Sequence, residues 1–373
     1  MPTDRVLVNF FYAHPVGHAV EALYYCLGYH AADPEREIAV VLNSATAVEL
    51  ADFCPFVSAT YAVDHSLVDP VPDSLTRLAH VPRDWDWVVD DFRRYQDIQF
   101  ELFPGLRDYH TATDTHFRPG KGRTAITSPK LPYAPRQHLR LELPAETRAA
   151  ARQRLSGRRR IAVLPAGSSD ASLYPSTDSW HLILDALADA YPDTEFVLVG
   201  KLGKDDRTST ALDAEGLAGL LAHRSKPVNA FDLPLAEQLA IVEACDVFLS
   251  PHSGFGLAAL AVGTPWLTLS GGRWFEYFFN GVPFRSIIPD TDRFPCFFQF
   301  DPVAVIDGRT PSMSDARIRA DLPRIVAAAG ELMSGSVSYP QALRDYFTDL
   351  VAAHHGDASG IWSIDGVHAD YVR

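Results

Sequence analysis

Residues 246–269 read Asp246-Val-Phe-Leu-Ser-Pro-His-Ser-Gly-Phe-Gly-Leu-Ala-Ala-Leu-Ala-Val-Gly-Thr-Pro-Trp-Leu-Thr-Leu269. The stretch falls into an apolar run at 246–250, a turn of small residues, a second apolar run at 257–262 and a third at 266–269. Short apolar runs bounded by Gly and Pro are typical of elements buried in a parallel sheet. The stretch therefore predicts a strand, a helix and a second strand, which together form one β-α-β unit.

The same alternation runs upstream of this unit. The predicted strands are 161–164 and 195–199, and the predicted helices are 179–190, 211–223 and 235–244. Strands that alternate with helices at this spacing indicate a doubly wound parallel sheet. We therefore expect residues 157–340 to form one Rossmann-like domain, followed by a C-terminal helix and tail at 341–373.

A second alternation occupies the N-terminal part of the chain. The predicted strands are 5–12, 37–43, 59–64 and 85–89, and the predicted helices are 19–30, 45–53 and 92–102. Residues 118–135 are rich in Gly, Pro and Lys, and this composition indicates a loop. We expect residues 1–156 to form another Rossmann-like domain, so that the fold class is α/β with two doubly wound parallel sheets.

The composition is that of a globular, acidic protein. Among 373 residues, 47% are hydrophobic, and the formal net charge is −14. Because nucleic acids and anionic membranes are bound through clustered Lys and Arg, this charge argues against both as partners. Any phosphate group must be held locally, by backbone N–H groups, helix N-termini or a few side chains.

The sequence gives no indication of export or of membrane insertion. The N-terminus lacks the basic, apolar and small-residue regions of a signal peptide, and no apolar run approaches the roughly 18 residues that a membrane span needs. The four cysteines, Cys26, Cys54, Cys245 and Cys296, are widely spaced and form no CxxC pair. Because such cysteines are typical of reduced, buried thiols, we expect a cytoplasmic protein.

Four turns of unusual composition follow predicted strands. In a doubly wound sheet, ligands lie at the carboxyl ends of the strands, beside the helix N-termini. Small residues there let a ligand approach the backbone, and Ser hydroxyls add hydrogen-bond donors. The four turns are His14-Pro-Val-Gly-His18, Pro165-Ala-Gly-Ser-Ser169, Gly200-Lys-Leu-Gly203 and Pro251-His-Ser-Gly-Phe-Gly256.

Three common motifs of other α/β proteins are absent from the sequence. No G-x-G-x-x-G follows the first predicted strand, and neither G-x-x-x-x-G-K-[ST] nor G-x-S-x-G occurs. These absences argue against a dinucleotide-dependent dehydrogenase, a P-loop kinase or ATPase, and an α/β-hydrolase.

The elements of the second half follow a recognisable order. Ile161-Ala-Val-Leu-Pro-Ala-Gly-Ser-Ser169 is followed by Phe196-Val-Leu-Val-Gly200, by Asp232-Leu-Pro-Leu with residues 239–246, and by His252 to Pro265. This order resembles the donor domain of the heptosyltransferase-like glycosyltransferases. The resemblance is good over roughly residues 160–270 and loose in the N-terminal half. It implies the GT-B fold, in which two Rossmann-like domains face a central cleft.

Two positions depart from the family pattern. His252 stands where the family usually has Asp, and Leu257 stands where it has His. The basic residue that usually follows the Gly-Ser turn is also absent, since the chain continues with Asp170-Ala-Ser-Leu-Tyr-Pro-Ser. Because the family's residues at these positions lie near the donor phosphates or sugar, the departures bear on which donor is bound.

The resemblance also implies a set of residues that hold a nucleotide-sugar donor. Helix dipoles and His252 would neutralise the departing diphosphate, so that neither a metal ion nor another cofactor is expected. The backbone around Gly200 and Lys201 would lie beside the nucleoside. The implied donor-binding residues are Gly167, Ser168, Ser169, Gly200, Lys201, His252, Ser253, Gly254 and Phe255.

His18 is the predicted general base. In the family, a Gly-Asp pair follows the first strand and its Asp is the base, whereas this chain has Gly17-His18 at that place. An inverting transfer needs a group that removes the acceptor hydroxyl's proton, and an imidazole titrates near neutrality. His14 is the second candidate. Glu21, one helical turn beyond His18, is expected to orient His18 or tune its charge.

We therefore expect an inverting, metal-independent glycosyltransferase that moves a sugar from a nucleotide sugar to a small-molecule or glycan acceptor. Two alternatives stay open. One is a sugar-nucleotide epimerase of the same fold, for which Asp90 and Asp91 are the candidate acid and base carboxylates. The other is a nucleotide-sugar-binding protein without catalysis. The sequence leaves the acceptor and the oligomeric state open.

Overall fold

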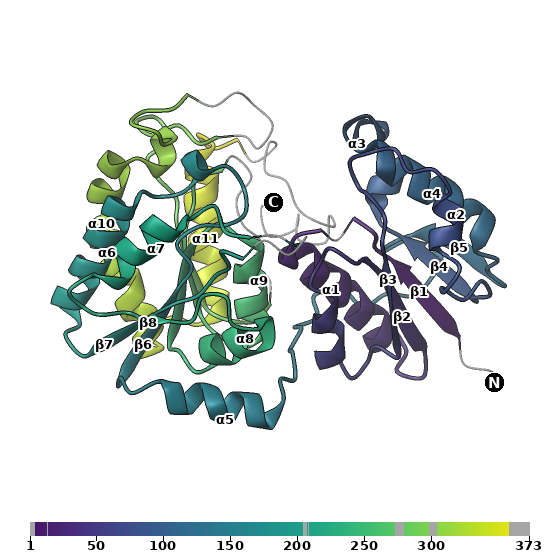
Figure 1. Cartoon of the computed structure of the whole chain (residues 1–373), viewed down its shortest axis with the longest axis horizontal. Helices are drawn as coiled ribbons and strands as arrows, with labels where there is room; N and C mark the ends of the chain where they lie inside the picture. The colour runs from purple at the N-terminus through teal and green to yellow at the C-terminus, as the bar shows by residue number, and fades with distance from the viewer. Residues whose placement is uncertain are drawn as a thin grey trace. The chain divides into compact units, whose positions relative to one another are not determined.

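The computed structural model describes residues 4–12, 14–203, 207, 209–272, 280–297 and 304–357. The chain divides into a first unit, which spans Met1–Glu142, and a second unit, which spans Leu143–Asp205 and Ser209–Arg373. Each unit contains one parallel β-sheet with helices packed on it (Figure 1).

The first unit is built on five parallel strands in the order β3-β2-β1-β4-β5. The strands are β1 (Arg5–Asn9), β2 (Glu37–Asn43), β3 (Ala59–Val63), β4 (Trp87–Asp90) and β5 (Gly122–Ala125). Val6, Leu7 and Val8 of β1 are all fully buried. A central strand covered on both faces is a continuous apolar run, and this is why the sequence pattern located it.

The helices of the first unit differ in places from the prediction. They are α1 (Val16–Ala32), η1 (Val48–Phe53), α2 (Ser74–Arg77), η2 (Phe92–Tyr95), α3 (Asp97–Leu102) and α4 (Pro104–His116). The predicted helix at 45–53 is the 3₁₀-helix η1, and the predicted helix at 92–102 is interrupted at Gln96, whose backbone is extended. The predicted loop at 118–135 contains β5, whose sequence Gly-Arg-Thr-Ala carries no apolar run.

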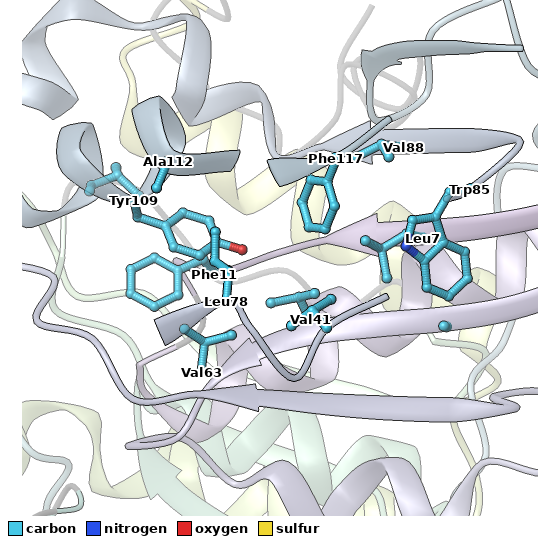
Figure 2. Close-up of a cluster of buried hydrophobic side chains, with 13 residues drawn as sticks. Leu7, Phe11, Val41, Val63, Leu78, Trp85, Val88, Tyr109, Ala112 and Phe117 are labelled. Atoms are coloured by element: carbon cyan, nitrogen blue, oxygen red, sulfur yellow. The ribbon is translucent and has the colours of Figure 1, made fainter. Parts of the chain in front are cut away.

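A cluster of buried side chains fills the space between this sheet and α4. The rings of Phe11 and Tyr109 stack with their centroids 3.9 Å apart (Figure 2). The Tyr109 hydroxyl also donates a hydrogen bond to Oδ1 of Asn9, the last residue of β1. The core therefore fixes α4 beside the carboxyl end of β1. The cluster comprises Leu7, Phe11, Ala39, Val41, Val63, Leu78, Val81, Trp85, Val88, Leu106, Tyr109, Ala112 and Phe117.

The second unit is built on six parallel strands in the order β11-β10-β9-β6-β7-β8. The strands are β6 (Arg159–Val163), β7 (Thr194–Leu198), β8 (Val228–Asn229), β9 (Val247–Pro251), β10 (Trp266–Leu269) and β11 (Phe284–Ile287). All five residues of β9 are buried. The two parallel sheets confirm the predicted α/β, doubly wound class.

The helices of the second unit cover both faces of its sheet (Figure 1). The helical elements are α5 (Ala145–Arg154), η3 (Ala171–Leu173), α6 (Thr177–Ala190), α7 (Ala214–Leu221), α8 (Leu235–Glu243), α9 (Gly254–Ala261), η4 (Pro311–Met313), α10 (Asp315–Ser334) and α11 (Tyr339–Ala353). Helix α9 begins at Gly254, three residues before the predicted start at 257, because the chain leaves its extended conformation immediately after Ser253. The 20-residue helix α10 has no counterpart among the predicted elements.

Helix α5 belongs to the second unit, although the sequence placed the domain boundary after residue 156. Arg148 of α5 pairs with Glu243 of α8 at 2.8 Å, and Arg154 pairs with Glu237 at 3.4 Å. The paired residues are about 90 positions apart in the sequence. The local pattern around Gly157 therefore could not indicate that α5 packs on the second unit. The structural division accordingly lies at Glu142 and Leu143.

Candidate functional site

The strand order predicts where a ligand crevice lies in each unit. In the first sheet, β2 lies on one side of β1 and β4 lies on the other; in the second sheet, β7 and β9 flank β6 in the same way. A doubly wound sheet binds ligands outside the carboxyl ends of its strands, at the point where the strand order reverses. The expected crevices therefore lie at the β1/β4 and β6/β9 edges.

The β1/β4 crevice gathers residues from two distant segments. Tyr12, His14 and His18 follow β1, whereas Asp91 and Arg93 follow β4. The rings of Tyr12 and His18 lie with their centroids 5.0 Å apart. The structure thus places both predicted base candidates, His14 and His18, after the carboxyl end of β1, where a doubly wound sheet is expected to bind its ligand.

The imidazole of His18 is held in its neutral form. Burial, followed by the charges of Arg93 and His14, lowers the pKa of His18 to about 3. The residue lies in the first turn of α1, and the positive end of the helix dipole also opposes protonation. Its Nδ1 atom is inaccessible to solvent and has no hydrogen-bond partner among the described residues. At neutral pH the ring is therefore unprotonated.

Arg93 is the charged centre of this crevice. Only 8% of the residue is exposed. Its Nη1 pairs with Asp91 at 2.9 Å, and its Nη2 pairs with Glu21 at 3.4 Å. The guanidinium carbon lies 4.3 Å from the centroid of the Tyr12 ring. Glu21, which was expected to orient His18 or tune its charge, pairs with the arginine that lowers the pKa of His18.

Asp90 and Asp91 serve as buried ion-pair partners. Asp90 is fully buried and accepts bonds from Nδ2 of Asn9 at 2.6 Å and from Nε of Arg123, also at 2.6 Å. Asp91 is 1% exposed and accepts a 3.0 Å bond from the backbone N–H of Arg93, so that it caps η2. Two carboxylates engaged in this way do not match the accessible acid and base that an epimerase needs.

The turn after β9 contributes the start of a helix to the β6/β9 crevice. Ser253 is the N-cap residue of α9, yet its side chain makes no capping hydrogen bond. It is 8% exposed, and its Oγ has no partner among the described residues. Gly254 opens the helix, where backbone N–H groups lack intrahelical partners. His252 is exposed, and the Phe255 ring lies 5.5 Å from that of Phe248.

The turn after β6 faces the same edge. Ser168 and Ser169 are exposed, and the backbone N–H of Ser169 donates a 3.0 Å bond to the Tyr174 hydroxyl. A Cβ atom on Gly167 would lie 2.6 Å from that hydroxyl oxygen, so that only glycine fits between the strand and the tyrosine. Because β6 and β9 are paired, the structure brings the 167–169 and 252–254 turns to neighbouring strand ends.

Gly200 and Lys201 follow β7, the strand on the other side of β6. The N–H of Gly200 donates to Oε1 of Gln238 at 2.9 Å, and its carbonyl accepts from Nε2 of Gln238 at 3.1 Å. Gly200 has φ +149, and a Cβ there would lie 2.7 Å from the Phe231 ring. Gly200 therefore shapes this turn, while the partly buried Lys201 extends from it.

Comparison with solved structures finds the same architecture in glycosyltransferases. The chain matches a glycosyl transferase family 9 structure from Veillonella parvula DSM 2008 with a TM-score of 0.61 and 14% identity, over 90% of this chain and 98% of that one. It matches the E. coli ADP-heptose LPS heptosyltransferase II structure with a TM-score of 0.57 and 15% identity, over 88% and 99%. The chain has their fold. No protein-family model and no curated protein sequence matches it.

This likeness confirms the predicted GT-B class and supports, at the level of fold, the resemblance read from residues 160–270. The sequence reasoning missed Tyr12 and Arg93. The only local signal was that Arg93 is a basic residue two positions after Asp91, near the end of a predicted strand. Their relation to His18 becomes visible once β1 and β4 are known to be neighbours.

Neither a metal site nor a membrane span is found among the described residues. No cluster of three or more His, Cys, Asp or Glu side chains in that part of the chain could hold a metal ion. No helix within the same ranges is long and apolar enough to cross a membrane.

Proposed function

We propose that the protein is an inverting glycosyltransferase that transfers a sugar from a nucleotide sugar without a metal ion. Two observations carry the proposal: a neutral histidine follows β1 of the first sheet, and β9 of the second sheet is followed by a helix N-terminus with a buried serine whose Oγ has no partner among the described residues. The GT-B fold of the structural neighbours supports the same reading.

The first unit would supply the general base. The acceptor hydroxyl attacks the anomeric carbon of the donor, and its proton passes to His18. The bond from that carbon to the diphosphate breaks, and the nucleoside diphosphate leaves with the electron pair. A single displacement of this kind inverts the configuration at carbon. His14 is the second candidate for the same role; burial lowers its pKa.

The second unit would hold the donor. The N-terminus of α9, beside Ser253 and Gly254, offers backbone N–H groups and the positive end of a helix dipole to a diphosphate. His252 is exposed beside them and can donate to the departing phosphate, so that the negative charge is balanced without a divalent ion. Ser168 and Ser169 would extend this site from the neighbouring turn, with Gly200 and Lys201 beside the nucleoside.

The test is an assay of nucleotide release with a panel of nucleotide sugars, in the presence of excess chelator. ADP-heptose heads the panel, because it is named as the donor of the E. coli neighbour. We expect nucleotide release that depends on an added acceptor. Interconversion of the donors would instead show an epimerase, and binding without turnover would show a binding protein. A strict requirement for Mg²⁺ or Mn²⁺ would contradict the metal-independent mechanism.

The donor site is tested separately by Ser253→Asp. A carboxylate at the helix N-terminus would repel the diphosphate, so we expect the affinity for donor to be lost while the fold is kept. Ser338→Asp is the matched control, because Ser338 is the exposed N-cap residue of α11, where aspartate caps a helix as well as serine does. If Ser253→Asp leaves donor affinity intact, the diphosphate binds elsewhere.

A further inference from the structure

Arg93 lies at the base of the β1/β4 crevice and is unusually well anchored. Asp91 accepts bonds from its backbone N–H and from Nη1, and Glu21 pairs with Nη2. Aromatic rings surround the guanidinium, whose central carbon lies 4.3 Å from the centroid of Tyr12 and 4.9 Å from that of Phe92. A buried cation held on several sides has a fixed position.

The Tyr12 ring links this cation to the proposed base. The ring contacts the Arg93 guanidinium. Its centroid also lies 5.0 Å from that of the His18 imidazole, and the two ring planes make an angle of 53°. The two carboxylates that anchor Arg93 come from different elements: Glu21 from α1, three residues beyond His18, and Asp91 from the end of β4. The ion pairs of Arg93 therefore connect α1 and the end of β4, and the same guanidinium contacts the Tyr12 ring.

We infer that Arg93 is a positioning residue for His18: its anchored guanidinium holds the Tyr12 ring against the imidazole and keeps a fixed positive charge near it. The inference rests on the proposed function, in which His18 takes the proton of the acceptor. Arg93 acts through Tyr12 and through its charge, and the proposal gives it no contact with substrate.

The charges around His18 determine the sign of the effect. Arg93 and His14 both lower the pKa of His18, and an interaction with the Tyr12 backbone raises it. Glu21 and Asp91 carry negative charge nearby but are paired with Arg93. Removal of the guanidinium therefore subtracts a positive charge and releases two carboxylates, and both changes favour the imidazolium form.

The decisive measurement is the NMR titration of the His18 imidazole in wild type and in Arg93→Gln, with the His18→Gln spectrum used to assign the resonance. We expect the proton affinity of His18 to rise at least about tenfold in Arg93→Gln. Arg93→Lys keeps the charge and should keep the imidazole neutral. Arg94→Gln is the matched control, because Arg94 is the adjacent arginine, pairs with Asp114 and lies over Tyr95.

Loss of Arg93 leaves two buried carboxylates without their cation, and this can prevent folding. The double variant Glu21→Gln with Arg93→Gln removes one of them, and we expect it to show the same direction of change. An unchanged His18 titration in whichever of these variants folds would overturn the inference, as would a change of equal size in Arg94→Gln.

The pH dependence of kcat/KM gives a second readout. In wild type we expect no loss of kcat/KM from protonation of His18 near pH 6.5. In Arg93→Gln the loss of kcat/KM at low pH should occur at a higher pH, closer to neutrality. The absence of turnover with every nucleotide sugar would contradict the proposed function. The NMR titration would still decide the role of Arg93, so that the two failures are distinguishable.

Discussion

His18 follows Gly17 in the first turn of α1, and the environment of its ring explains its chemistry. Burial and the Arg93 charge remove the imidazolium form at neutral pH, and Nδ1 is left without a partner. His65, by contrast, uses both of its ring nitrogens, with Ser66 and Ser74.

The corresponding prediction is that His18→Ala lowers kcat by at least about a hundredfold, because proton transfer in the transition state is lost. Donor affinity should stay within a few fold, since the donor-binding turns belong to the second unit. Steady-state kinetics and a donor titration measure both quantities. His18→Asp should recover part of the activity, because a carboxylate can act as the base. Near-normal turnover in His18→Ala would shift the assignment to His14.

At the scale of elements, the position of the proposed donor-binding turn depends on how closely α9 packs against β10. A Cβ atom on Gly256 would lie 2.1 Å from the Trp266 ring, which is fully buried and bonded to Ser250. Neither partner can move without shifting the strand end or the helix start. The position of the α9 N-terminus, and of Ser253 with it, is therefore set by a glycine two residues further along the chain.

Gly256→Ala is accordingly expected to destabilise the fold by about 1–3 kcal/mol through overpacking and to weaken donor binding as α9 is displaced. Urea unfolding and donor titration measure the two effects. Gly219→Ala in α7 is the matched control, since its added Cβ would lie 3.3 Å from a Thr177 methyl group. That change should be neutral or stabilising, because alanine favours a helix. Equal stability of the two variants would argue against the packing constraint.

Element prediction succeeded where apolar runs are long and failed where tertiary contacts define the element. Strand β2 was located at both ends, because its residues from Ile38 to Leu42 form an unbroken buried apolar run. Strand β5 exists only because β4 pairs with it. Helix α10 contains Pro323 and a fully buried Arg317, which obscure its apolar periodicity. Arg317 bonds to Asp321 and to the carbonyls of Ser270 and Ile287, a role that sequence reveals only after the sheet is known.

At the scale of the whole molecule, buried histidines couple stability to pH. Burial lowers the pKa of His110 well below its usual value, and the residue is only 3% exposed. The unfolded chain therefore binds more protons than the folded chain once the pH falls below about 6.5, and folding stability decreases as acid is added. The lowered pKa of His18 acts in the same direction.

The prediction is that the urea concentration at the unfolding midpoint decreases as the pH is lowered from 7 to 5. His110→Phe should make this decrease smaller. A phenylalanine has a similar shape and cannot be protonated, and it would pack beside Phe100 and Tyr109. Each pH unit below the unfolded pKa costs about 1.4 kcal/mol for a histidine that stays neutral when folded. An identical pH dependence in wild type and variant would show that His110 is protonated in the folded protein.

The sequence by itself determined the α/β class, most of the central strands and the turns that end them, because buried parallel strands and glycine-rich turns leave local signatures. It also placed His18 and the Ser253 turn at strand ends. Only the tertiary structure decided which strands are neighbours. Asn9 and Asp90 are 81 residues apart in the chain, yet they pair across β1 and β4, and the same crossover brings Arg93 and Tyr12 to His18. The charge beside the proposed base therefore comes from chain topology, which no local pattern of residues encodes.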